Sequence, residues 1–328
     1  MAYSKEVVRR ARRRLENAKA DREAENLRRL QEAYRQIPRL KELDMLLRQT
    51  MALAAQAAFA MGGDAREAME KVRDANLALQ RERQALVDAN FEKGYLDEGP
   101  ICEYCGGSGY IGSTMCSCLK ELCRQEQKKE LSVLACGEGR FEDFRLDYYS
   151  DGVDGKLGYS PRSIMERCLQ VSRKYAMNFG TGSGNLLFYG GTGLGKTFLS
   201  ACIATVVAER GYSVAYESAH HLFSILEKNR FSPDEESREQ AEKLMTCDLL
   251  ILDDLGTELP GNFVTAALYS LVNDRLLAGK PMLISTNLTA EEIGHRYSPQ
   301  IASRLQGNFR RLIFVGEDIR VRKNRGEL

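Results

Sequence analysis

The sequence predicts an α/β protein whose main domain is a parallel sheet with helices on both faces, preceded by an α-helical region and a small metal-binding module. Three observations support this prediction. Residues 190–197 match a phosphate-binding loop set between a strand and a helix. Apolar runs of strand length alternate with helical segments from residue 185 onward, which is typical of a parallel sheet. Two pairs of cysteines lie within residues 102–118.

Composition limits the class of protein. The 328 residues carry a formal net charge of +1 and include 28% charged residues, which fits a soluble protein and excludes a polycation. The basic N-terminus is not followed by the apolar segment of a signal peptide, and residues 49–63, the longest stretch of low charge, are too short to span a bilayer. We therefore expect a cytoplasmic protein with no membrane contact. In that reducing compartment, the nine cysteines are not expected to form disulfides.

The phosphate-binding loop follows an apolar run at residues 185–189 and precedes a helical segment at residues 198–210. Its glycines let backbone N–H groups turn toward phosphates, and the helix N-terminus adds a partial positive charge. Lys196 is expected to reach the β- and γ-phosphates, and Thr197 to hold Mg²⁺. The loop predicts binding of a nucleoside triphosphate, with ATP as cofactor, by Gly190, Gly191, Thr192, Gly193, Leu194, Gly195, Lys196 and Thr197.

Two acidic residues follow the apolar strand expected at residues 247–252. Asp253 is expected to hold Mg²⁺, directly or through water, and Asp254 to polarise the attacking water as a general base. Asn287 ends another expected strand, at residues 281–286, and would lie near the γ-phosphate. Strands at residues 213–218 and 311–315 complete the predicted sheet, with ligands at its carboxyl edge.

The cysteine pairs are Cys102–Cys105 and Cys116–Cys118, separated by ten residues. Two thiol pairs joined by a loop can converge on one tetrahedral Zn²⁺, and four thiolates leave no open position for a catalytic water. We therefore predict a structural zinc ion. Redox thiols and an iron–sulfur cluster are alternatives, and Cys123 is close enough in sequence to be an alternative ligand.

Residues 3–93 are predicted to be helical, with Pro38 either kinking a helix or opening a new one and with a break at Gly62, Gly63 and Asp64. Such an amphipathic region either binds a partner or forms a purely structural bundle.

Aromatic residues at 141–149 are expected to pack against the following domain, with recognition of adenine as the alternative. Residues 220–238 either contact DNA or form a plain surface helix.

Five stretches of the sequence resemble the AAA+ ATPases of the DnaC/DnaI helicase-loader family and the related IstB transposition ATPases. They are the phosphate-binding loop, Leu-Leu-Ile-Leu-Asp-Asp-Leu-Gly at residues 249–256, Ile-Ser-Thr-Asn at 284–287, Ile-Ala-Ser-Arg-Leu at 301–305, and Phe-Val-Gly-Glu-Asp-Ile-Arg at 314–320. The resemblance covers roughly residues 140–320.

The resemblance implies roles for three further positions. Asn287 corresponds to sensor 1, Arg304 to an arginine finger that acts on the ATP of a neighbouring subunit, and Arg320 to the sensor 2 arginine. Such a finger in trans implies a homo-oligomer. The short segment after Asn287 implies a core without the separate helical lid of most AAA+ proteins. The Asp-Asp pair, where the family more often has Asp-Glu, implies slow hydrolysis.

The resemblance also implies a function. In the loader family, the N-terminal region binds the replicative hexameric helicase and the ATPase contacts single-stranded DNA. The cysteine pairs resemble the zinc-bearing domain of the DnaI-like branch, which IstB proteins lack. The alternative is an IstB-like ATPase that binds duplex DNA and recruits a transposase. The predicted parts are a partner-binding region (1–98), a zinc module (99–126), a connector (127–165) and an AAA+ ATPase domain (166–328).

Overall fold

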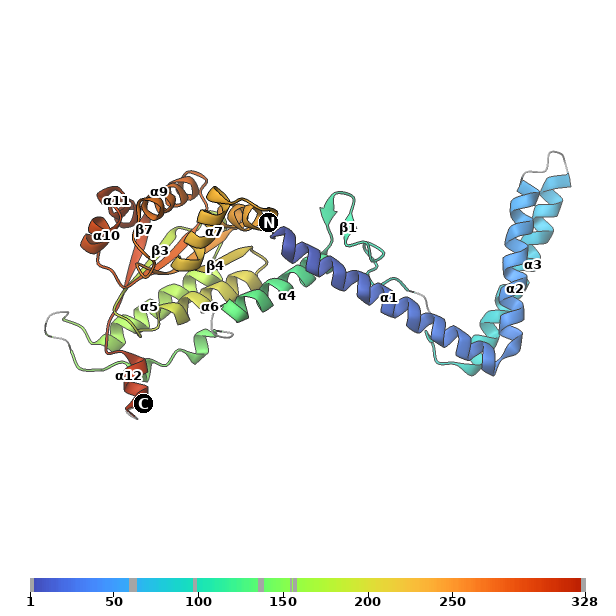
Figure 1. Cartoon of the computed structure of the whole chain (residues 1–328). Helices are drawn as coiled ribbons and strands as arrows, with labels where there is room; N and C mark the ends of the chain where they lie inside the picture. Colours follow the sequence, from blue (N-terminus) through green and yellow to red (C-terminus); the bar gives the residue numbers. More distant parts are fainter. Residues whose placement is uncertain are drawn as a thin grey trace. The chain divides into compact units, whose positions relative to one another are not determined.

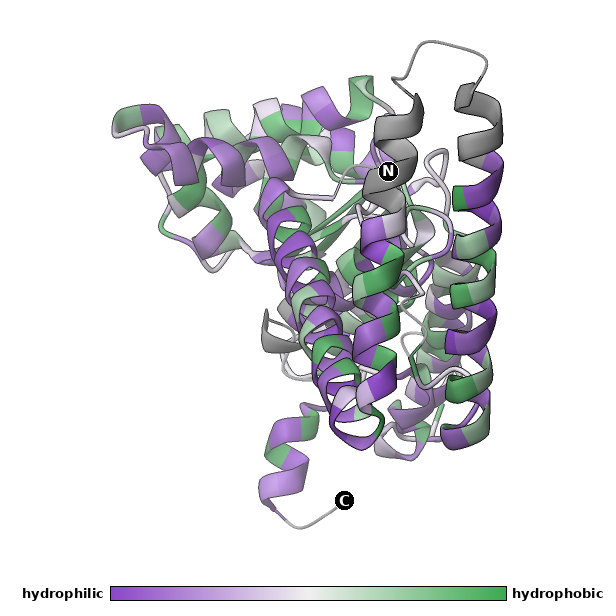
Figure 2. Cartoon of the chain, turned by 90° about the vertical axis from the view of Figure 1, so that its right-hand side faces the viewer, coloured by the Kyte–Doolittle hydropathy of each residue, from purple (hydrophilic) through white to green (hydrophobic). Residues whose placement is uncertain are grey.

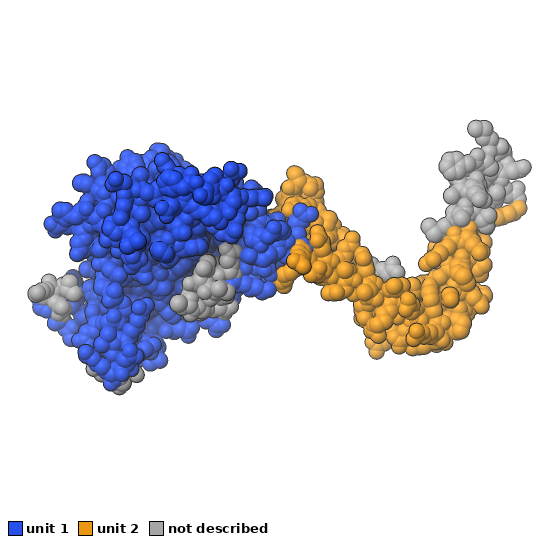
Figure 3. Space-filling view, in the orientation of Figure 1, with its two compact units in different colours: residues 1–12, 117–328 blue, residues 13–116 orange. Residues whose placement is uncertain are grey.

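The computed structural model describes residues 3–58, 64–96, 99–134, 139–153, 155 and 158–325. The chain divides into two compact units, which Figure 3 colours separately. Unit 1 comprises residues 1–12 and 117–328, and unit 2 comprises residues 13–116. Each unit is described by itself below.

A five-stranded sheet forms the centre of unit 1, and all of its strands are parallel, as predicted (Figure 1). In space the strands follow the order β4-β5-β6-β3-β7. The predicted and observed strands differ mainly at their ends, because hydrogen bonding to neighbours rather than apolar character decides where a strand begins. The strands are β3 (Asn185–Gly190), β4 (Val214–Ser218), β5 (Leu249–Leu255), β6 (Met282–Thr286) and β7 (Phe309–Phe314).

Helices cover both faces of this sheet, which confirms the predicted layering. On one face, α5 and α6 pack with the sheet in a hydrophobic cluster around Phe188 and Leu199. On the other face, helices α7 to α11 pack around Leu250 and Leu268. The helices of unit 1 are α4 (Ser117–Leu134), α5 (Pro161–Met177), α6 (Lys196–Glu209), α7 (Ala219–Phe231), α8 (Glu235–Thr246), α9 (Asn262–Leu277), α10 (Ala290–Arg296), α11 (Pro299–Asn308) and α12 (Ile319–Asn324), with short 3-10 turns η1 (Phe141–Asp143) and η2 (Leu146–Tyr148).

Both ends of the described chain contribute to unit 1. After β7, the described residues form the six-residue helix α12. At the other end, the Tyr3 hydroxyl donates to the Gly211 carbonyl at 3.3 Å, and Lys5 pairs with Glu242 at 3.3 Å. The first turns of the first helix are therefore fixed to the unit that carries the phosphate-binding loop.

Unit 2 is largely helical. Helix α1 (Lys5–Gln36) continues into it from unit 1, followed by α2 (Pro38–Ala58) and α3 (Asp64–Asn90). Pro38 opens a new helix, which resolves the two alternatives for this proline. The expected break at Gly62 and Gly63 falls outside the described residues. A two-stranded hairpin, β1 (Tyr110–Ile111) and β2 (Thr114–Met115), lies in the cysteine-rich segment.

Polar pairs connect the helices of unit 2. The Asp44 carboxylate accepts from the Tyr34 hydroxyl at 2.6 Å and pairs with Arg83 at 2.6 Å. In Figure 2, hydrophilic residues recur along every long helix. None of the described helices is long and apolar enough to cross a membrane.

Candidate nucleotide site and cysteine cluster

The phosphate-binding loop connects β3 to α6, as its motif predicts. Two of its glycines are required by close neighbours. A Cβ at Gly190 (φ 144°) would lie 2.2 Å from the carbonyl oxygen of Phe314, and one at Gly193 (φ 67°) would lie 1.9 Å from Asp318 Oδ1. Asp318 caps α12, so this short helix lies directly against the loop.

Lys196 is buried at the start of α6, with only 5% of its surface exposed. Its Nζ donates to the carbonyl oxygens of Gly190 at 2.8 Å and Gly191 at 2.6 Å, and to Asn287 Oδ1 at 2.6 Å. Burial lowers the pKa of Lys196 from its ordinary value, and the charges of Asp254 and Asp253 partly oppose that change. The structure therefore brings Lys196 and Asn287, distant in sequence, into direct contact.

The two consecutive aspartates have different environments. Asp253 is 6% exposed, and each of its carboxylate oxygens accepts a hydrogen bond: Oδ2 from the Tyr216 hydroxyl at 2.9 Å and Oδ1 from the Ser285 hydroxyl. Tyr216 and Ser285 belong to β4 and β6, the strands on either side of β5. The Asp253 carboxylate is therefore fixed from both sides by neutral donors.

Asp254 instead lines a cavity beside the phosphate-binding loop. It has a left-handed backbone (φ 55°), uncommon for a residue other than glycine, and the pairing of β5 with β6 shifts register between Leu252 and Leu255. Its N–H donates to Ser285 Oγ at 2.9 Å. Burial, followed by the charge of Asp253, raises the pKa of Asp254.

The cavity has a volume of about 540 Å³ and is bordered by the phosphate-binding loop. Of the residues predicted from sequence, Thr192, Gly193, Leu194, Gly195, Lys196, Thr197, Asp254, Asn287 and Arg320 line it. Arg304 does not line the cavity. Its guanidinium lies on α11, donates to the Tyr269 hydroxyl at 2.7 Å and to Asn273 at 3.2 Å, and stacks 4.4 Å from the centre of the Tyr269 ring.

Residues outside the sequence motifs also line the cavity, some of them in the aromatic segment 141–149 for which recognition of adenine was the alternative. Two cations stack on the Tyr148 ring: Arg145 Cζ lies 5.4 Å from the ring centre, and Lys323 Nζ lies 5.0 Å from it. All three line the cavity, together with Phe144. Phe141 and Tyr149 are buried in the core, as expected for an aromatic cluster that packs against the domain. The segment before α5 thus has both a packing role and a place at the cavity.

The four predicted cysteine ligands converge. The sulfur atoms of Cys102, Cys105, Cys116 and Cys118 all lie within 4.8 Å of one another. Cys102 Sγ and Cys116 Sγ are 3.8 Å apart, which matches the edge of about 3.8 Å for a sulfur tetrahedron with Zn–S bonds of about 2.3 Å. The backbone N–H of Gly109 donates to Cys105 Sγ at 3.3 Å. The cluster is compatible with zinc, and Cys123 is not part of it.

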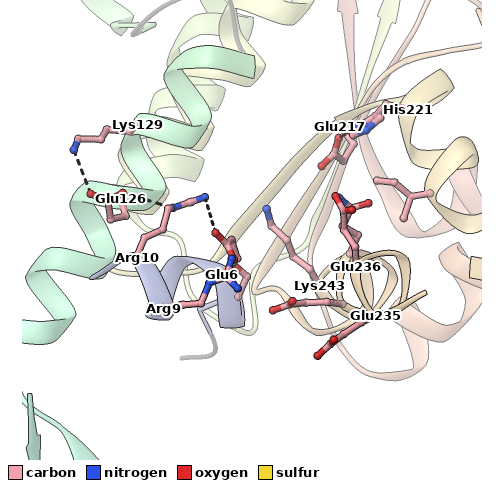
Figure 4. A pocket seen from close by; sticks show the side chains of 14 residues that line it. Glu6, Arg9, Arg10, Glu126, Lys129, Glu217, His221, Glu235, Glu236 and Lys243 are labelled. Atoms are coloured by element: carbon pink, nitrogen blue, oxygen red, sulfur yellow. Dashed lines mark hydrogen bonds and ion pairs between the residues drawn. The ribbon is translucent and has the colours of Figure 1, made fainter. Parts of the chain in front are cut away.

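A second, larger cavity in unit 1 has a volume of about 960 Å³ and is lined by the start of α1 together with α4, α7 and α8 (Figure 4). Six glutamates line it, among them Glu126, which pairs with Lys129 at 3.2 Å and Arg10 at 3.6 Å. Glu217 contacts the His221 ring at 2.5 Å. The lining also contains Arg9, Arg10, Lys129 and Lys243. It includes part of the 220–238 stretch, for which contact with DNA stays one of two interpretations.

The segment that contains the phosphate-binding loop is similar to known proteins. Residues 161–314 match the family of IstB-like ATP binding proteins. The replicative helicase loader DnaI of Bacillus subtilis is 31% identical over 120 residues, which are 36% of this chain and 38% of that protein. An ATP-binding protein of an insertion sequence from Mycobacterium tuberculosis is 27% identical over 149 residues, 43% of this chain and 58% of that protein. The chain therefore spans between about two fifths and three fifths of these relatives.

Among solved structures, the DnaC helicase loader aligns with 53% of this chain and 98% of its own, with 19% identity and a TM-score of 0.44.

Proposed function

We propose that this chain is an ATPase of DNA replication that loads a replicative hexameric helicase onto single-stranded DNA. The match of residues 161–314 to the family of IstB-like ATP binding proteins supports this proposal. The observation that carries the proposal is the presence, on one chain, of this matched segment, a cluster of four thiols and a helical unit. The similarity to a helicase loader in Bacillus subtilis supports it. Such a role would place the protein in the cytoplasm.

The second candidate is an ATPase that binds duplex DNA and recruits a transposase. The insertion-sequence relative from Mycobacterium tuberculosis favours it. The thiol cluster and helical unit favour the loader, because in the resemblance described above the IstB branch lacks the zinc-bearing domain. Co-elution of the full chain with a hexameric helicase in size-exclusion chromatography supports loading. Filaments on duplex DNA without helicase affinity would instead support the transposition role.

We propose that ATP lies in the 540 Å³ cavity, with its phosphates at the loop of residues 190–197. Lys196 would contact the β- and γ-phosphates, while Thr197 and Asp253 would hold Mg²⁺, whose charge offsets that of the phosphates. Asp254 would accept a proton from the attacking water. The oxygen of that water would bond to the γ-phosphorus while the bond between the γ-phosphorus and the β–γ bridging oxygen breaks. Asn287 and Arg320 would orient and neutralise the γ-phosphoryl group.

Tyr216 is proposed as a positioning residue for this reaction, since its hydroxyl orients the Asp253 carboxylate. A hydrogen bond to a charged group contributes about 1.5–3 kcal/mol. We therefore expect Tyr216→Phe to raise the Mg²⁺ concentration needed for half-maximal ATP turnover by about tenfold or more. A titration of turnover against Mg²⁺ at saturating ATP measures this.

Tyr175→Phe is the matched control, because the buried Tyr175 hydroxyl has no hydrogen-bond partner among the described residues. Like Tyr216→Phe, the Tyr175→Phe variant removes one buried hydroxyl. The dependence of its ATP turnover on Mg²⁺ should equal that of the wild type. Equal effects of the two variants would show that Tyr216 has only a structural role.

We propose that Cys102, Cys105, Cys116 and Cys118 hold one structural Zn²⁺. The sulfur spacing and the amide donated to Cys105 support this assignment. Cys105→Ser is expected to remove zinc from the purified chain, as measured by mass spectrometry of the metal, and to make the segment around residues 99–118 sensitive to protease. The ATPase unit should remain resistant.

Cys123→Ala is the control for the zinc assignment. Cys123 is buried, and its thiol pKa is raised by burial to about 11, which disfavours the thiolate that binds metal. This variant should retain one zinc ion per chain. Loss of zinc in Cys123→Ala but not in Cys105→Ser would reverse the assignment.

Unit 2 is proposed as the region that binds the helicase. Leu27, Met45, Leu46 and Leu77 are exposed on its three long helices, with between 38% and 57% of each residue accessible. Exposed apolar side chains are the usual anchors of helix-mediated recognition. The division into parts at residues 1–98, 99–126, 127–165 and 166–328 stays a prediction.

A further inference from the structure

A third cavity in unit 1 has a volume of about 690 Å³ and lies at the other end of the strands from the nucleotide cavity. It is lined by α5, by the turn at Ser183 and Gly184, and by the first residues of β3 and β7. Those strands are neighbours, with Leu186 paired to Arg310. The nucleotide cavity is at the carboxyl ends of the strands, whereas this cavity is at their amino ends.

Three cationic side chains line this cavity and no carboxylate does. Arg167 and Lys174 are seven residues apart on α5 and therefore share one face of the helix. Arg310 comes from the edge strand β7. None of the three has an ion pair within the described part of the chain. The acidic residue next to Arg167, Glu166, accepts a hydrogen bond from Gln170 at 3.3 Å.

This arrangement differs from that of two other arginines on α5. Arg162 pairs with Asp151, and Arg173 pairs with Glu142. Three unpaired cations around one recess produce a local positive potential that attracts polyanions. Lysine and arginine neutralise phosphates of nucleic acids without regard to base sequence.

We propose that the α5–β7 cavity binds the phosphodiester backbone of single-stranded DNA through Arg167, Lys174 and Arg310. This inference rests on the proposed function, in which the ATPase acts on single-stranded DNA. Because the two cavities lie at opposite ends of the strands, DNA in the α5–β7 cavity does not compete with ATP for the nucleotide cavity. Duplex DNA presents the same phosphodiester chemistry, so the experiment includes both forms.

The chain provides a matched pair of variants on β7. Arg310 and Arg311 are adjacent, exposed and lack any ion pair within the described residues. They point to opposite faces of the strand: Arg310 shares its face with Leu312, which packs with α5, and Arg311 shares its face with Phe309, which packs in the other cluster. Arg310→Ala therefore removes a charge from the cavity, while Arg311→Ala removes an equal charge outside it.

The test measures binding of full-length chains to a fluorescein-labelled oligothymidylate by anisotropy over a series of salt concentrations. Each phosphate that the protein neutralises contributes about 0.7 to the magnitude of the slope of log affinity against log salt for a single strand, so loss of one contact reduces that magnitude by about 0.7. Arg310→Ala and Lys174→Ala should each show that reduction and weaker binding, whereas Arg311→Ala should match the wild type. ATP turnover without DNA should be unchanged in all three.

The possible outcomes separate this inference from the proposed function. If the wild type binds the single strand and Arg310→Ala and Arg311→Ala have equal affinity and slope, the cavity assignment is wrong and the loader proposal stands. If the wild type binds only a duplex, and Arg310→Ala weakens that binding, the phosphodiester site stands and the single-strand assignment is wrong. If the wild type binds neither form, both the cavity assignment and the proposed contact with DNA are wrong.

Discussion

Lys196→Ala is expected to lower ATP turnover by at least about a hundredfold, because removal of one preorganised donor from a developing anion typically costs about 10²–10³ in kcat. The buried ammonium contacts two carbonyl oxygens of the loop and Asn287. No other lysine lies in the loop. Steady-state release of phosphate at saturating ATP measures the effect.

Lys228→Ala is the control for Lys196→Ala. Lys228 is an exposed lysine on α7 that pairs with Asp234 and does not line the nucleotide cavity. Its replacement should leave turnover unchanged. Thermal unfolding of both variants establishes whether the fold is retained. Turnover within a few fold of the wild type in a folded Lys196→Ala chain would contradict the assignment of this site.

Arg304→Ala is expected to abolish turnover while nucleotide binding remains, if Arg304 serves the ATP of a neighbouring subunit. Arginine fingers contribute about 10³–10⁵ in kcat in the GTPases where they have been measured. In its own chain, Arg304 contacts Tyr269 and Asn273 and does not line the ATP cavity. A fluorescent nucleotide analogue should therefore bind the variant with the affinity of the wild type.

Mixing two inactive variants tests whether the finger acts in trans. The Arg304→Ala chain keeps an intact phosphate-binding loop, and the Lys196→Ala chain keeps an intact finger. A mixed assembly pairs the working loop of one with the working arginine of the other, so turnover should reappear on mixing. A mixture no more active than the sum of its components, at concentrations where the wild type is active, would rule out this role.

The local features of unit 1 could be predicted from the sequence. The motif places Lys196 at a strand-to-helix turn, and apolar runs of strand length locate the central strands, because both signals are confined to short segments. The four thiols were predicted for the same reason: their spacing along the chain determines which of them can meet. The structure confirms the parallel sheet and brings these sulfur atoms together.

What the sequence could not supply depends on contacts between distant segments. The sequence predicts different roles for the two adjacent aspartates but not their surroundings, which depend on a register shift and on the left-handed backbone of Asp254. Tyr216 belongs to no motif, and its proposed positioning role depends on the β4–β5 pairing that places its hydroxyl beside Asp253. Arg322 lies outside the sequence motifs, yet its guanidinium donates to the Tyr148 carbonyl at 2.7 Å.

The most direct test of the loader proposal is the transfer of a hexameric helicase onto closed circular single-stranded DNA, which has no end over which a ring could pass. The full-length chain, the helicase and ATP are incubated with the circle, and the helicase that remains on the DNA after a salt wash is measured. The proposal predicts loading that requires the wild-type chain and is lost with Lys196→Ala. Equal helicase on the circle with and without the chain, under conditions where the chain hydrolyses ATP, would contradict it.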